Sequence, residues 1–227
     1  MFDVEVRDMD WDNIPDMGEQ ALAGYEPADQ PLFRKVRDAL CRHKCLDKFG
    51  LFLVHKHFQM SADEKLVENV DFVRRRVVVQ VMSDFELSDR RIIPTNWIFG
   101  SEAENDGVEI MVAQWGFADD LLGTVDPLSS EYAACFEEVR TILAADGPVD
   151  RFGMFLIRNQ MEFEDGNQLE CTDHEARTLT LTPQPPADDR DSVLPTNWIF
   201  TPDETVAVNC CECARNSSGH LGYHRQR

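Results

Sequence analysis

Two histidines separated by one residue, His55 and His57, are the first candidates for chemistry in this chain. They lie near the end of an apolar run that begins at Phe49, and residues two apart on a strand point to the same side. Two imidazoles on one face can bind a divalent metal ion, with a carboxylate completing the ligand set. Glu68, beyond the next turn, is the expected third ligand or a general base. The alternative is a pair of histidines that only form hydrogen bonds at a strand end.

A second candidate is the set Glu68, Asp71 and Arg75, which recurs later in the chain as Glu170, Asp173 and Arg177. Glu68 and Arg75 are therefore the candidate catalytic residues. Because the set occurs in both copies, it could also be a structural ion pair. An arginine near the core needs a carboxylate partner. For Arg177 the nearest partners in sequence are Asp173 and Glu170.

The C-terminal segment offers a second group of metal ligands. Cys211, Cys213, His220 and His224 have the spacing C-x-C-x6-H-x3-H, and tetrahedral zinc accepts such a set. The alternative is two core thiols followed by a loose tail. The chain has seven cysteines, an odd number, and its acidic start does not resemble an export signal, so we expect reduced thiols or metal ligands rather than disulfides.

The elements that must position these residues occur twice. The hexapeptide PTNWIF at 94–99 recurs unchanged at 195–200, and residues 48–54 (KFGLFLV) match residues 151–157 (RFGMFLI). These matches keep their order and spacing, so they predict two copies of a unit of about one hundred residues. Arg158 and Gln160 then occupy, in the second copy, the positions of His55 and His57. We expect a polar recess there in which Arg158 could bind a substrate carboxylate or simply reach solvent.

Each copy predicts one helix followed by about four strands. Apolar residues at helical spacing predict a helix that ends near residue 47 in the first copy and near residue 147 in the second. The apolar runs that follow each helix predict strands. The predicted fold is α+β: an internal duplication of a helix plus a four-stranded, mainly antiparallel sheet, the two copies sharing one core. The predicted organisation is an acidic lead-in at 1–30, repeat units at 31–128 and 129–214, and a basic tail at 215–227. The expected strands are 49–58, 75–82, 96–99 and 108–115 in the first copy, and 152–161, 177–182, 197–200 and 205–213 in the second.

Composition narrows the functional classes. The 227 residues include 42 acidic and 22 basic side chains, a formal charge of −20, which disfavours binding to nucleic acid or to an anionic membrane surface. No run approaches the roughly 18 apolar residues of a membrane span. No phosphate-binding glycine loop, Gly-x-Ser-x-Gly elbow or His-Glu-x-x-His helix occurs.

The sequence therefore predicts a cytoplasmic metal-binding protein with its site in the first repeat, and zinc is the expected ion. Such a site could serve a metal-dependent enzyme acting on a small molecule. The alternative is a non-enzymatic binding or inhibitor protein whose acidic surface docks a basic protein.

Overall fold

The structure is a computed structural model of the chain. The described residues are 4–8, 11, 14, 26–71, 73–74, 76–100, 108–119, 129, 131–146, 151–157, 168–183, 193–202, 208–216 and 219–220. Within them the strands are β1 (Val4–Asp8), β2 (Phe49–Leu53), β3 (Glu64–Asp71), β4 (Arg76–Ser83), β5 (Ile92–Phe99), β6 (Val108–Phe117), β7 (Phe152–Leu156), β8 (Gln168–Asp173), β9 (Thr178–Pro183), β10 (Val193–Ile199), β11 (Val208–Asn216) and β12 (Gly219–His220). The helices are the 3-10 turn η2 (Pro27–Asp29), α1 (Gln30–Arg42), the short α2 (Asp84–Leu87) and α3 (Ala133–Asp146).

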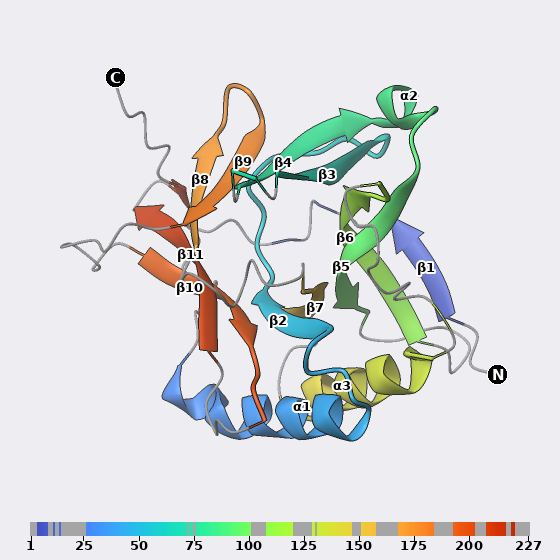
Figure 1. Ribbon diagram of the computed structural model, residues 1–227, viewed down its shortest axis with the longest axis vertical. Coiled ribbons are helices and arrows are strands. Elements are labelled where there is room, and N and C mark those ends of the chain that lie inside the picture. The colour runs from blue at the N-terminus through green and yellow to red at the C-terminus, as the bar shows by residue number, and fades with distance from the viewer. Residues whose placement is uncertain are drawn as a thin grey trace.

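All twelve described strands belong to one mixed sheet. Its order is β1-β6-β3-β4-β9-β8-β11-β10-β2-β7-β5, and β12 extends it from β11. Because β5 also pairs with β6, the sheet curls until its path closes (Figure 1). Three described pairs are parallel, namely β1–β6, β3–β6 and β8–β11, and the others are antiparallel.

The predicted α+β architecture is wrong. The protein is mostly sheet with few helices, and its strands form one curled mixed sheet instead of two four-stranded units. Strands of the two halves of the chain pair directly: β2 with β7 and β10, β5 with β7, and β4 with β9. The prediction also missed β3 and β8, whose sequences EKLVENVD and QLECTD carry charged or polar residues among the apolar ones.

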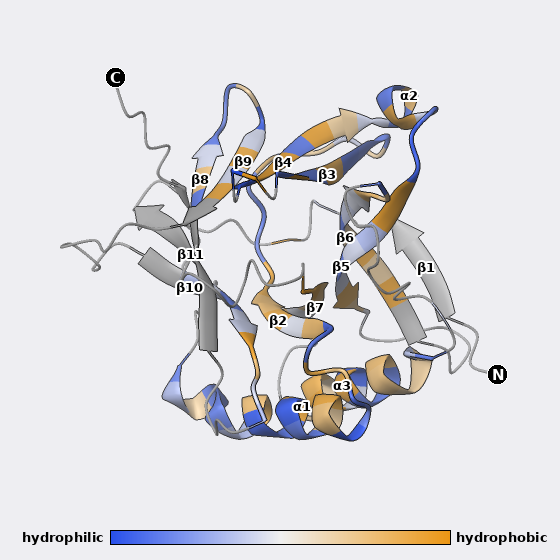
Figure 2. Ribbon diagram, in the orientation of Figure 1, coloured by the Kyte–Doolittle hydropathy of each residue, from blue (hydrophilic) through white to orange (hydrophobic). Residues whose placement is uncertain are grey.

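Helices α1 and α3 lie side by side and cover one face of β2 and β7 (Figure 1). Helix α1 forms because Pro31 sits at its start and because Phe33, Val36 and Leu40 recur at helical spacing and are buried. Phe33 packs edge-on against Trp198 at 5.2 Å, and Phe136 of α3 packs edge-on against Trp97 at 5.3 Å, measured between ring centroids. Figure 2 shows the hydrophobic residues of β2 above these helices.

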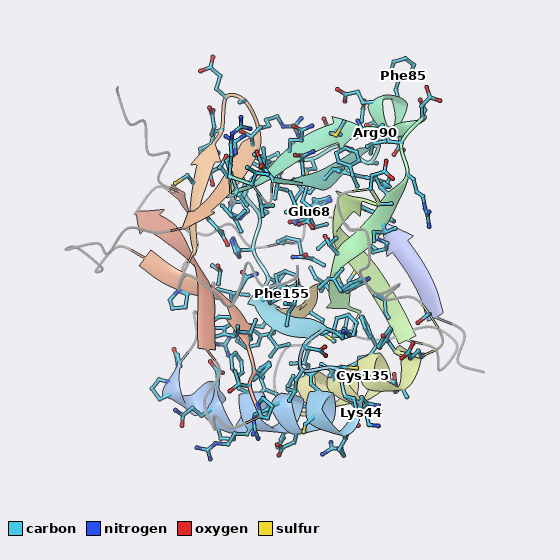
Figure 3. The ribbon with its side chains drawn as sticks, in the orientation of Figure 1. Lys44, Glu68, Phe85, Arg90, Cys135 and Phe155 are labelled. Carbon is cyan, nitrogen blue, oxygen red and sulfur yellow. The ribbon has the colours of Figure 1, made fainter. Side chains whose placement is uncertain are left out.

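The opposite side of β2 and β7 faces the inside of the curl. Because side chains alternate along a strand, Phe49, Leu51 and Leu53 face the helices, whereas Phe52 and Phe155 belong to a separate inner cluster. Figure 3 shows Phe155 and Glu68 in the interior enclosed by the sheet, and Phe85 at its outer rim. Ile14, from the acidic N-terminal segment, is buried in the same inner cluster. Of the described helices, none has the length and apolar character needed to cross a bilayer.

Candidate metal centre

Three potential metal ligands meet inside the curled sheet. Their ligand atoms, on His55, His57 and Glu170, all lie within 4.8 Å of one another. Oε2 of Glu170 lies 3.4 Å from Nε2 of His57 and 3.7 Å from Nε2 of His55. The three side chains are only 6%, 9% and 5% exposed for His55, His57 and Glu170 respectively. The cluster is thus removed from bulk water.

Hydrogen bonds turn each ligand towards the centre of the cluster. Nδ1 of His55 lies 2.8 Å from the carbonyl oxygen of Leu53, and a carbonyl only accepts, so Nδ1 is the donor and Nε2 is the nitrogen left to face a metal ion. Nδ1 of His57 is hydrogen-bonded to Oγ1 of Thr172 at 3.1 Å. Metal-binding histidines characteristically use their second nitrogen in this way.

Glu170 is oriented by its neighbour on β10. The Thr196 hydroxyl donates to Oε1 of Glu170 at 2.8 Å, and the other carboxylate oxygen, Oε2, is the atom nearest the two imidazoles. Ligands bonded to tetrahedral zinc at about 2.0–2.1 Å lie roughly 3.3 Å apart. The distances of 3.4 and 3.7 Å are therefore close to those of a zinc ligand set.

A cavity of about 60 Å³ adjoins the cluster and is lined by all three ligands. Its other walls are mainly apolar, and Phe52, Ile98 and Leu181 are among them. Polar groups also reach it from Asn96 and Gln114. A metal ion held by three protein ligands beside such a cavity would keep a coordination position open for water or a small molecule.

Sequence reasoning identified the histidines but named a different carboxylate. Glu68 is fully buried on β3, where it accepts a hydrogen bond from Nε2 of Gln114 at 2.6 Å, and it is outside the His55–His57–Glu170 cluster. The histidines also lie just beyond β2, which ends at Leu53, rather than on the strand itself. Their ring centroids are nevertheless only 4.7 Å apart.

Glu170 was visible in the sequence as the counterpart of Glu68, but it was not assigned to His55 and His57. Arg177 instead pairs with Glu64, through contacts of 2.6 and 2.9 Å, and it lies in the turn before β9. Asp173 accepts hydrogen bonds from backbone N–H groups in that turn, including that of Ala176 at 2.9 Å. Of the two threonines that orient these ligands, Thr172 gave no signal in the sequence, and Thr196 was visible only as part of the repeated PTNWIF segment.

The remaining candidate residues lie wholly or partly outside the described part of the chain. Arg75, Arg158, Gln160 and His224 are not among the described residues. The backbones of Cys211, Cys213 and His220 are described in β11 and β12, but their side chains are not. The zinc site predicted at the C-terminus and the polar recess predicted in the second copy therefore remain predictions.

Comparisons of the chain with protein-family models, with curated proteins and with solved structures find no match to any of them. The geometry of the cluster and its cavity is therefore the basis on which a function can be inferred.

Proposed function

We propose that the protein binds one divalent metal ion, zinc by the chemistry of the ligands, through His55, His57 and Glu170. The proposal is carried by the convergence of two imidazoles and one carboxylate within 4.8 Å in the interior of the sheet. Two neutral imidazoles and a carboxylate match the three-ligand sets of zinc sites that keep one coordination position open. A dication would also offset the charge of a carboxylate that is only 5% exposed.

The ion would act as a Lewis acid towards whatever small molecule enters the cavity. It could polarise a carbonyl oxygen or lower the pKa of a bound water. Glu170 would serve as a ligand, while Leu53, Thr172 and Thr196 would hold the three ligands in position. We place the protein in the cytoplasm, where described thiols such as buried Cys45 and Cys135 would stay reduced.

Metal analysis of matched variants tests the proposal. Wild-type protein purified without chelator, stripped and titrated with Zn²⁺ or Co²⁺ should bind one equivalent, and Co²⁺ should give the intense visible absorption of a tetrahedral complex. Glu170→Gln and His55→Ala should lose this equivalent, because each removes a ligand atom. If the site on the C-terminal segment also binds metal, that second equivalent should survive these two substitutions.

Glu68→Gln is the matched control, because Glu68 is an equally buried carboxylate on the corresponding strand of the other half. It should keep the metal. Binding of less than a tenth of an equivalent by the wild type would contradict the proposal and make the cluster a hydrogen-bonded His–Glu group. Equal loss of metal in Glu68→Gln and Glu170→Gln would assign the effect to general destabilisation.

A further inference from the structure

Asn96 presents a polar group to the same cavity. Its side chain lines the cavity with the three candidate ligands, and the residue is only 8% exposed. Strand β5 sets this position, because Trp97 packs against Phe136 of α3 on the outer face of the sheet. Side chains alternate along a strand, so the neighbours Asn96 and Ile98 point to the inside. The repeated PTNWIF segment thus supplies an inner polar residue as well as an outer aromatic one.

The Asn96 side chain lacks a hydrogen-bond partner for its oxygen. Oδ1 is buried and accepts no hydrogen bond from any described residue. Buried amide groups are nearly always hydrogen-bonded, since leaving one unsatisfied opposes folding. An amide side chain next to a cavity and a candidate metal centre is therefore a group that a bound molecule would satisfy.

The acceptor character of the Asn96 oxygen limits the class of that molecule. Oδ1 of Asn96 can only accept a hydrogen bond, so it favours a ligand that carries an N–H donor. A carboxylate offers acceptors alone and does not meet this need. The space of about 60 Å³ suits roughly four to six non-hydrogen atoms, and the walls at Phe52 and Ile98 favour an alkyl group.

We infer that the open metal position takes a small neutral primary carboxamide. This inference rests on the proposed metal site. The carbonyl oxygen of the ligand would bind the ion, its N–H group would donate to the Asn96 amide oxygen, and its short alkyl group would pack against Phe52 and Ile98. Asn96 is thus a specificity-determining residue, because it selects ligands that carry an N–H donor.

Two constitutional isomers, propionamide and N,N-dimethylformamide, provide the test. They have the same number of atoms and a carbonyl oxygen, but only propionamide carries N–H groups. Each is titrated into Co²⁺-loaded protein while the visible absorption of the ion is followed, with propionate as the anionic counterpart. We expect propionamide to bind at least tenfold more tightly than either of the others.

Asn96→Leu should reduce the affinity for propionamide at least tenfold and leave that for N,N-dimethylformamide and the Co²⁺ stoichiometry unchanged. Because the substitution removes a buried amide oxygen that has no hydrogen-bond partner among the described residues, it should also raise the Tm of the ligand-free protein. Thr95→Val is the control, since Thr95 is buried on the same strand and is not one of the described residues that line the cavity. It should leave both affinities unchanged.

The outcomes separate this inference from the metal proposal. Failure of Co²⁺ to bind overturns both. Stoichiometric Co²⁺ with equal affinity for the two isomers overturns the carboxamide inference alone, as would unchanged propionamide binding in Asn96→Leu. The comparison of isomers uses wild-type protein and so stands even if the variant does not fold.

Discussion

At the scale of single residues, burial distinguishes Glu170 from most of the acidic residues whose side chains the structure describes. An ionised carboxylate loses much of its hydration when buried and needs compensation from hydrogen bonds or from a positive charge. The hydrogen bond from Thr196 supplies part of that compensation. His55 and His57 converge on the same carboxylate, as the ligands of a metal site would. A bound metal ion would explain why these three polar side chains share an interior position.

The ion pair between Glu64 and Arg177 contrasts with this buried cluster. Hydrogen bonds from Arg177 and, secondly, from the backbone N–H of Ser61 lower the pKa of the Glu64 carboxyl to about 2. The folded pKa is below the unfolded value, so the pair stabilises the fold fully above pH of about 4.5 and loses this contribution as the pH falls through about 2. The same contact holds Arg177 in a left-handed conformation, with φ of 49°.

We predict that Glu64→Gln lowers the free energy of unfolding by about 1 kcal/mol at pH 7, a value reduced for solvent screening because Arg177 is 37% exposed. The difference from the wild type should shrink steadily between pH 5 and pH 2. Urea denaturation at a series of pH values measures it. Glu175→Gln, at an exposed carboxylate in the same turn, is the control. A difference that stays constant with pH would show that the ion pair is not its source.

At the scale of elements, local patterns predicted some of the structure well and some of it poorly. The helical spacing of Phe33, Val36 and Leu40 corresponds to α1, and the apolar run from Phe49 corresponds to β2. Strand β3 gave a weaker signal, because its inner side carries buried Glu68 between Leu66 and Val70. A charged residue in the middle of an inner face hides the alternation by which strands are recognised.

The candidate site was predicted in the same uneven way. The spacing of His55 and His57 is local, so the sequence reveals it directly. Glu170 lies more than one hundred residues further on and reaches the histidines only because β8 and β2 are parts of one closed sheet. No local pattern encodes which strands of the two halves pair, and for this reason Glu68, the nearer carboxylate, was the natural choice.

The strand pair β2–β7 is packed so closely that it leaves no room for a Cβ atom at two glycines. Gly153 on β7 pairs with Phe52 on β2, and Gly50 pairs with Phe155 in the reciprocal arrangement. A Cβ placed on Gly153 would lie 2.4 Å from the Phe52 ring and 2.4 Å from the carbonyl oxygen of Trp97. Both distances are much shorter than a normal van der Waals contact. One of the two atoms is a backbone oxygen, which cannot move aside by a side-chain rotation.

We therefore predict that Gly153→Ala lowers the free energy of unfolding by about 3 kcal/mol or more, by overpacking at the centre of the sheet. The double variant Gly153→Ala with Phe52→Leu should recover little of this loss, because the contact with Trp97 oxygen persists. Chemical denaturation of the two single variants and the double variant measures the effect. Full recovery in the double variant would mean that the ring alone excludes a side chain at this position.

At the scale of the whole molecule, the two halves of the chain complete each other. Along the closed path, strands β6, β3 and β4 of the first half are followed by β9, β8, β11 and β10 of the second half, and then by β2, β7 and β5. Strands of the two halves therefore pair where β4 meets β9 and where β2 lies between β7 and β10. The inner cluster likewise combines Phe52 and Ile98 with Phe155 and Ile199. Each half by itself would expose these strand edges and apolar faces to water.

The candidate metal centre shares this dependence, since its histidines precede residue 128 and its carboxylate follows residue 129. We predict that fragments 1–128 and 129–227, expressed separately, show no cooperative thermal unfolding. Neither should give the tetrahedral Co²⁺ absorption attributed to His55, His57 and Glu170. Co-expressed fragments should associate and bind one equivalent at this site, and Glu170→Gln in the second fragment should abolish that binding. A folded 1–128 fragment that binds Co²⁺ with the same absorption as the whole protein would show that the histidines find a carboxylate within their own half, and Glu170 would then not be the third ligand.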